Sequence, residues 1–159
     1  YDEVALRIEI AKVIAEIKPD VVIGPDHKLY PESHPDHLRV GEAVSKAYFM
    51  CSNVNMMKSV GATQIAKPTV LAYYFTGKPN RFVKITKKDF EKTKAAYACF
   101  VSQCPPPDNG KSLMLYMRLK VRLNGLRSFH IRADAFRVMN NMHIHCCGEA
   151  EDTAIRRPL

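Results

Sequence analysis

The sequence contains no apolar run of the roughly 18 residues that a membrane-spanning helix requires, and no secretory signal peptide at its start. It also contains no internal repeat and no low-complexity segment. These absences argue against a membrane protein and a repeat protein, so we expect a cytoplasmic protein with no membrane partner. An initiator methionine is absent too, and we interpret Tyr1 as an internal point of a longer protein. The 159 residues, 47% hydrophobic and 25% charged, have the size and composition of one globular domain.

Cysteine pairs of the CxxC type are missing, although the chain has five cysteines. An odd number without that spacing fits reduced thiols in a cytosolic protein better than a disulfide framework. Cys146 and Cys147 lie next to His145, and these three residues offer donors for a zinc ion. Adjacent cysteines rarely chelate one ion well, so we interpret them as structural or incidental thiols.

Acidic residues are in deficit, with 16 Asp and Glu against 24 Lys and Arg, and the formal net charge is +8. A basic protein can attract nucleic acid or another acidic partner. Much of the excess lies within residues 111–132, where Arg118 and Arg122 are four residues apart on a predicted helix. Aromatic residues do not interleave with this charge as a base-stacking surface would require. We therefore interpret the segment as a solvated helix face and expect no nucleic-acid partner.

Apolar spacing divides the chain into alternating helices and strands. Helical spacing over residues 3–18 ends before Pro19, and the apolar run 21–23 predicts a strand buried on both faces. A helix is predicted from Pro35 to Met50, whereas residues 51–68 show no clear period and are interpreted as a loop. The remaining patterns predict strands at 69–76, 81–85 and 131–139 and helices at 86–100 and 114–123. This alternation predicts an α/β fold with a mainly parallel sheet.

The motif that carries chemistry is the tetrad at residues 34–37, His-Pro-Asp-His, which follows the predicted strand at 21–23 after a polar loop. Loops after parallel strands are where α/β proteins place their sites, and histidine is the commonest metal ligand. His37, at the start of a helix, is the candidate zinc ligand. Asp36 can orient a neighbouring imidazole, and His34 can face a developing oxyanion or leaving group. On the tetrad alone, two surface histidines on a proline turn explain the motif equally well.

A second metal motif overlaps the tetrad. Glu32, His34, Asp36 and His37 resemble the HxHxDH signature of metallo-β-lactamase-like hydrolases, with glutamate in place of the first histidine. That family follows its motif with small, glycine-rich residues, whereas residues 38–43 here begin a helix. We therefore favour a different family.

The stretch from Lys18 to His37 resembles the second motif of the LmbE-like (PIG-L) zinc de-N-acetylases, and it is most similar to the archaeal diacetylchitobiose deacetylases. Downstream, Ser102-Gln103 resembles the H-x-S-Q segment of the family, and residues 133–137 resemble its A-E-A-F-R strand. His145 falls where archaeal members have a late histidine near the substrate cleft. The likeness covers residues 7–145 in the right order, which makes it far more specific than the tetrad.

The resemblance implies a Rossmann-like three-layer α/β sandwich that binds one zinc ion per complete site. It implies hydrolysis of an N-acetyl amide on an N-acetylglucosamine-type sugar or conjugate. In that family, a histidine matching His37 is a zinc ligand. A histidine matching His34, paired with an aspartate matching Asp36, stabilises the oxyanion and protonates the leaving amine. The same analogy makes Asp134 and His145 contacts for the substrate, and it favours a homo-oligomer.

Two features depart from the family pattern. The A-H-P-D-D motif, which supplies two zinc ligands and the general base, is absent, and Phe100 stands where the H-x-S-Q segment has its histidine. We therefore interpret residues 1–145 as the C-terminal two-thirds of one deacetylase domain and residues 146–159 as a tail, with the first strand and helix units missing. The alternative is a catalytically inactive binding or scaffold domain of the same fold.

Overall fold

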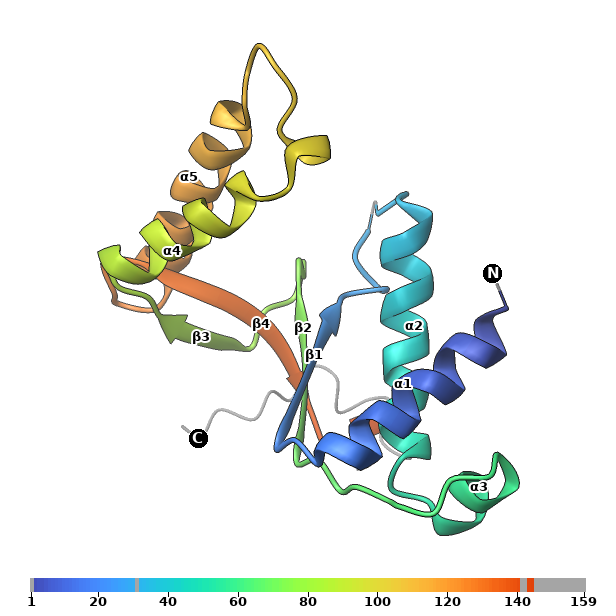
Figure 1. The fold of residues 1–159 in the computed structure, drawn as a ribbon. Helices are drawn as coiled ribbons and strands as arrows, with labels where there is room; N and C mark the ends of the chain where they lie inside the picture. The colour runs from blue at the N-terminus through green and yellow to red at the C-terminus, as the bar shows by residue number, and fades with distance from the viewer. Residues whose placement is uncertain (1, 31, 141–142, 145–159) are drawn as a thin grey trace. The chain divides into compact units, whose positions relative to one another are not determined.

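The computed structural model describes residues 2–30, 32–140 and 143–144, and it divides into two compact units (Figure 1). The first unit comprises the described residues up to Arg81 and from Phe136 onward, and the second unit is Phe82–Ala135. No helix within the described ranges is long and apolar enough to cross a bilayer. The extent of a single domain over residues 1–145 stays a prediction.

The sheet contains strands β1 (Val21–Pro25), β2 (Val70–Tyr74), β3 (Arg81–Lys84) and β4 (Ala133–Met139), in the order β1-β2-β4-β3. β1 and β2 are parallel, with Pro25 beside Tyr74 at their carboxyl ends. β4 pairs antiparallel with β2. The α/β class is confirmed, and the expectation of a mainly parallel sheet is met in part, because β1 and β2 are parallel whereas β4 is antiparallel to β2. Residue types predict where strands occur, whereas strand direction depends on how the connections run.

Among the described residues, the first unit contains helices α1, α2 and α3. α1 (Glu3–Ile17) begins at Asp2, whose carboxylate accepts the backbone N–H of Val4 at 2.9 Å, and it ends at Lys18 in the left-handed conformation. α2 (Pro35–Met50) has the predicted bounds. The prediction of a loop over 51–68 is wrong in part, because α3 (Val54–Ser59) lies within it, capped by the side chain of Asn53. A helix of six residues is too short to show a period.

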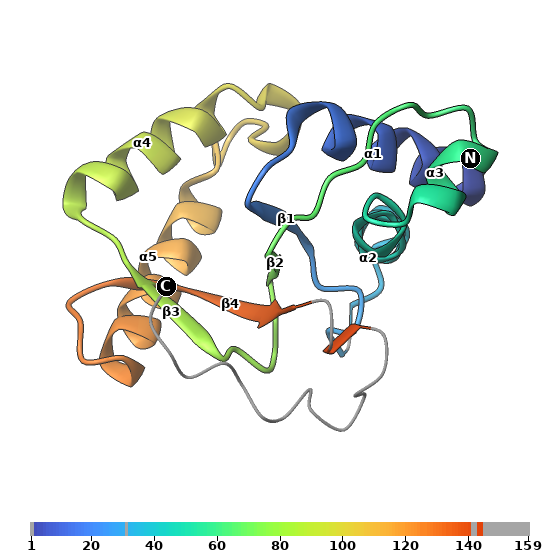
Figure 2. The same ribbon diagram turned by 90° about the horizontal axis from the view of Figure 1, so that it is seen from below.

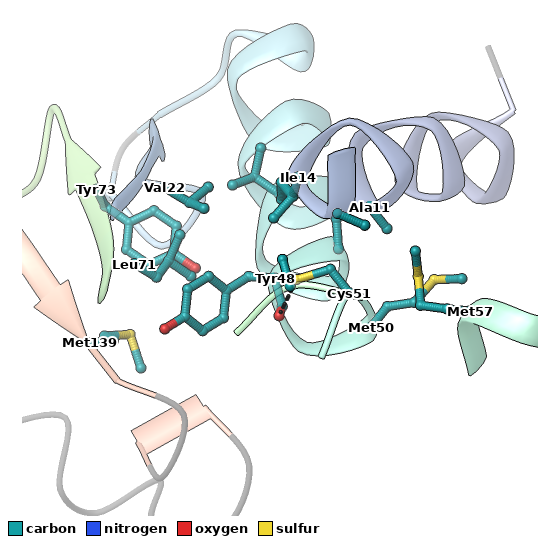
Figure 3. Packing of buried hydrophobic residues seen from close by; sticks show 14 residues of the cluster. Ala11, Ile14, Val22, Tyr48, Met50, Cys51, Met57, Leu71, Tyr73 and Met139 are labelled. Atoms are coloured by element: carbon teal, nitrogen blue, oxygen red, sulfur yellow. Dashed lines mark hydrogen bonds between the residues drawn. The ribbon is translucent and has the colours of Figure 1, made fainter. Parts of the chain in front are cut away.

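The core of the first unit lies between helices α1 and α2 and one face of β1 and β2 (Figures 1 and 2). Ile14 from α1, Tyr48 from α2 and Leu71 from β2 meet there (Figure 3). Val22 points into this cluster, whereas Val21 and Ile23 on the other face of β1 are 41% and 56% exposed. The prediction of a strand buried on both faces is therefore wrong, because described residues cover only one face of β1.

The second unit contains α4 (Lys87–Ala98), a 3₁₀ turn at Val101–Gln103 and α5 (Lys111–Arg127). Thr86 caps α4 as predicted, and Thr86 and Asp89 form a reciprocal capping box. α5 is longer than the predicted 114–123. Arg118 and Arg122 lie exposed on α5, as the interpretation of a solvated face requires.

Candidate active site

The tetrad lies where β1 passes through a loop, residues 26–34, into α2. His34 is the N-cap of α2, Pro35 occupies the first turn and Asp36 follows it. Proline is favoured there because its missing N–H would have no partner in the helix, and an acidic side chain is stabilised by the helix dipole. β1 and β2 are parallel neighbours, so the loop leaves the sheet at the edge where their carboxyl ends meet.

A buried ion pair fixes the start of this loop. Asp26 accepts hydrogen bonds from Nε and Nη2 of Arg137 at 2.9 and 2.5 Å, and each residue is only 4% exposed. The backbone N–H of Asp26 donates to the Tyr74 carbonyl at 3.0 Å. Burial by itself would raise the pKa of the Asp26 carboxyl, but hydrogen bonds from Arg137 and Thr76 hold that pKa below its ordinary value. Asp26 thus ties the loop to β2 and β4.

His27 packs at the same end of the loop, edge-on to Tyr73 with ring centroids 5.6 Å apart. Its Nδ1 atom is buried and has no hydrogen-bond partner among the described residues. Burial lowers the pKa of His27, and the nearby Arg137 guanidinium lowers it further, so the neutral form of the ring is favoured. Gly41 lets α2 approach closely here, since a Cβ at that position would collide with the Pro25 carbonyl oxygen and lie 2.9 Å from Cβ of His27.

The far end of the loop carries a second acidic side chain. Oε2 of Glu32 lies 2.8 Å from Nδ1 of His37, and Oε1 of Glu32 accepts the backbone N–H of His34 at 2.8 Å. The glutamate side chain is 17% exposed and the histidine side chain 38% exposed. These hydrogen bonds hold the pKa of Glu32 below its ordinary value, and the bond with His37 has the largest effect. One carboxylate therefore touches both histidines of the tetrad.

The two imidazoles stack on each other, with ring centroids 4.6 Å apart and planes inclined by 22°. Nδ1 of His34 accepts the backbone N–H of Asp36 at 3.3 Å. Within the described part of the chain, the Asp36 carboxylate makes no hydrogen bond to either ring and faces solvent. Among the described residues, the carboxylate that contacts an imidazole of the tetrad is therefore that of Glu32, and the role expected of Asp36 stays a prediction.

His34, Asp36 and His37 lie at the start of α2, and their catalytic and metal-binding roles stay predictions. Asp134 belongs to the second unit, where its carboxylate accepts the N–H of Ala135 at 2.9 Å. His145 lies outside the described residues, as do Cys146 and Cys147. Phe100, which takes the position of the family's histidine, is 59% exposed in the second unit.

The residues that sequence reasoning misses are Glu32, as the partner of His37, and the pair of Asp26 with Arg137. The sequence suggests Glu32 only as a metal ligand of the second motif. Its five-residue spacing from His37 is a local signal, because the turn before a helix can fold a side chain back onto the first turn. Asp26 and Arg137 are 111 residues apart and share no such signal.

The fit of a metal ion depends on the donors present. A histidine with one ring nitrogen held by a carboxylate is the usual setting of a metal ligand, so His37 fits that role. Within residues 2–30, 32–140 and 143–144, no three side chains of His, Cys, Asp or Glu gather as a metal-binding group. Glu32 and the tetrad do not form the cluster that the metallo-β-lactamase-like motif requires. Of the described thiols, Cys51 is buried in the core, and burial raises its pKa to about 11.

Two known proteins similar to this chain are diacetylchitobiose deacetylases. The diacetylchitobiose deacetylase of Thermococcus kodakarensis is 32% identical over 146 residues, covering 89% of this chain and 53% of the relative. The structure of N,N'-diacetylchitobiose deacetylase from Pyrococcus horikoshii, complexed with its inhibitor MPG, matches with a TM-score of 0.77 and 28% identity. That match covers 89% of this chain and 54% of the enzyme. No protein-family model matches.

A more distant structure, the conserved protein TT1542 from Thermus thermophilus, shares the fold with a TM-score of 0.65 at 20% identity, over 83% of this chain and 57% of that one. The chain spans about half the length of the deacetylases it matches. The predicted resemblance to the LmbE-like (PIG-L) deacetylases, and among them to the diacetylchitobiose deacetylases, is therefore confirmed by sequence and by fold.

Proposed function

We propose that this chain supplies one half of the active site of a zinc-dependent N-deacetylase acting on an N-acetylglucosamine-type sugar or conjugate. The observation that carries the proposal is the tetrad itself. It begins a helix at the carboxyl end of a parallel strand, within a chain that matches diacetylchitobiose deacetylases over 89% of its length. The reaction class is amide hydrolysis, in which water adds to the acetyl carbon, the C–N bond breaks, and acetate and a free amine are released.

His37 is the residue that would hold the metal, together with donors from outside the described residues. Zinc, when bound, lowers the pKa of a bound water and polarises a carbonyl oxygen. His34 sits one helical turn away and is stacked on His37, so it reaches the same reacting group. In this proposal His34 stabilises the negative oxygen that forms on the acetyl group and gives a proton to the departing amine.

Asp36 supports His34 in this scheme. Its backbone N–H donates to Nδ1 of His34 at 3.3 Å and so orients that ring, while its carboxylate faces solvent. Contacts of Asp134 and His145 with the substrate, and assembly into a homo-oligomer, belong to the same proposal.

The test is acetate release from N,N'-diacetylchitobiose, together with the zinc content, for this chain and for a longer gene product that contains it. We expect one zinc ion per longer chain. We expect His34→Ala to lower kcat by about 10²- to 10⁴-fold, which is the usual contribution of a general acid. His130→Ala is the matched control, because His130 is an exposed histidine of the second unit. Full activity in a zinc-binding His37→Ala variant would contradict the proposal.

A catalytically inactive binding domain of the same fold is the second candidate. It is favoured by the lack of a three-residue metal group among the described residues, and by Phe100 at the position of the family's histidine. Absence of zinc from both proteins, with retained binding of the sugar, would support this second candidate.

A further inference from the structure

The two histidines of the tetrad offer different ring nitrogens to their neighbours. Nδ1 of His37 lies 2.8 Å from Oε2 of Glu32. An ionised carboxylate can only accept hydrogen bonds, so Nδ1 of His37 must carry the proton. In the neutral ring, the lone pair is then on Nε2.

In His34, by contrast, Nδ1 is the hydrogen-bond acceptor. Its Nδ1 faces the backbone N–H of Asp36 at 3.3 Å, and a backbone amide can only donate. Nδ1 of His34 therefore carries the lone pair, and Nε2 of the neutral ring carries the proton. The two stacked imidazoles are in opposite tautomers, with one Nε2 able to accept and the other able to donate.

We propose that Glu32 is a positioning residue that holds His37 in the Nδ1–H tautomer and so keeps its Nε2 available as a metal donor. The second oxygen of the same carboxylate accepts the backbone N–H of His34 at 2.8 Å. Glu32 therefore anchors the N-cap residue of α2 and orients a ring in the first turn of that helix. The Glu32 side chain is 17% exposed, so it is only partly shielded from the water that competes for these two bonds.

The choice of tautomer has a chemical consequence. A neutral imidazole binds a metal only through a nitrogen that has lost its proton, and the hydrogen bond of the other nitrogen decides which one that is. Without Glu32, the His37 ring would exchange between tautomers and rotate, and only part of the population would present Nε2. The tautomer follows from the geometry alone, whereas its use for a metal rests on the proposed function.

The experiment is nitrogen NMR of the histidine rings in the ¹⁵N-labelled, metal-free chain. It is recorded about two pH units above 6.5, the approximate pKa of an ordinary histidine. We expect His37 to show a protonated Nδ1 and an unprotonated Nε2, and His34 to show the reverse. In Glu32→Ala, the ring signals of His37 should move to the tautomer mixture of the exposed His130, while those of His34 keep their pattern.

The matched control is Glu42→Ala. Glu42 lies on the same helix and pairs with Lys46 at 2.7 Å, and it touches neither histidine of the tetrad. This variant removes one negative charge from α2 and should leave both ring spectra unchanged. A protonated Nε2 on His37 in the unsubstituted chain would overturn the proposal even if Glu32→Ala failed to fold. An unchanged His37 spectrum in a folded Glu32→Ala variant would overturn it as well.

The proposed role of Glu32 toward the metal is tested with zinc alone, in a longer gene product that binds zinc. There Glu32→Ala should weaken zinc affinity by about 10- to 100-fold, the usual effect of losing the partner of a metal-bound histidine. Equal zinc affinity in both proteins would overturn the role toward the metal. The expected tautomers in a protein that binds no zinc would contradict the proposed function and leave the hydrogen-bond assignment intact, so the two failures can be told apart.

Discussion

The loop between β1 and α2 has a carboxylate near each end, and the two are used in different ways. At its start, Asp26 is 4% exposed and is paired with an arginine from a distant strand. Near its end, Glu32 is partly exposed and is paired with a histidine five residues away. Each carboxylate accepts at least two hydrogen bonds, so the number of contacts does not separate them.

The two pairs differ in how much hydration their charged groups lost on folding. Burying Asp26 and Arg137 removed two full charges from water, a cost that is offset by their mutual contacts and by further hydrogen bonds to Asp26 from Thr76 and the Lys28 backbone. Glu32 and His37 kept part of their hydration, and His37 need not be charged to make the contact. We therefore expect the first pair to matter for stability and the second to matter for the orientation of one ring.

The largest effect is expected when the buried pair is broken. Asp26→Ala leaves the Arg137 guanidinium buried without its partner, and we expect a loss of about 3–5 kcal/mol in the free energy of unfolding. The measurement is urea denaturation followed by circular dichroism.

The double variant with Asp26→Leu and Arg137→Met sharpens the comparison. It removes both charges and should recover much of the loss, because apolar replacements of a buried pair are often neutral. A double variant as unstable as the single one would show that the loop needs the ion pair itself.

The next effect concerns the close approach of α2 to the loop. Gly41→Ala drives a Cβ into the Pro25 carbonyl oxygen, and backbone cannot move aside as a flexible side chain can. We expect a loss of about 1–3 kcal/mol, which is typical of overpacking. Gly77→Ala is the control, because its nearest neighbour is Cδ1 of Leu29 at an ordinary 3.4 Å. Thermal unfolding of the two variants should separate them, and equal melting temperatures would contradict this account of the helix position.

A smaller effect is expected from acid at the start of the loop. The folded state lowers the pKa of His27, so below the ordinary histidine pKa of about 6.5 the unfolded chain binds a proton that the folded chain resists. The free energy of unfolding should therefore be highest above that pH and should decline as the pH falls below it. His27→Phe keeps a ring against Tyr73 without titrating. Its unfolding free energy should decline less than that of the unsubstituted chain between about pH 8 and about pH 5. An identical decline in both proteins would assign the pH dependence to other groups.

These contrasts also show which features of the fold and of the site can be predicted from the sequence. Local signals predict α1, α2 and the capping of α4, because apolar spacing, Pro35 and Thr86 act within a few residues of themselves. The tetrad is predictable for the same reason. The direction of β4, the exposed face of β1 and the pairing of Asp26 with Arg137 depend on residues far away in the chain. A single sequence carries no signal for such pairings, and the role of Glu32 is hidden because its motif suggests a metal ligand.

The smallest effect on stability is expected at the end of the loop, and that expectation tests the comparison most directly. Glu32→Ala removes two short hydrogen bonds, yet water can reach both donors once the side chain is gone. The melting temperature of Glu32→Ala should therefore match that of Glu42→Ala, which loses an exposed ion pair on α2. A large loss specific to Glu32→Ala would mean that the carboxylate holds the loop in place as Asp26 does. Equal melting temperatures combined with a changed His37 ring spectrum would show that Glu32 orients the His37 ring and does not stabilise the fold. A contact that served only the stability of the fold would give the opposite result, a lower melting temperature.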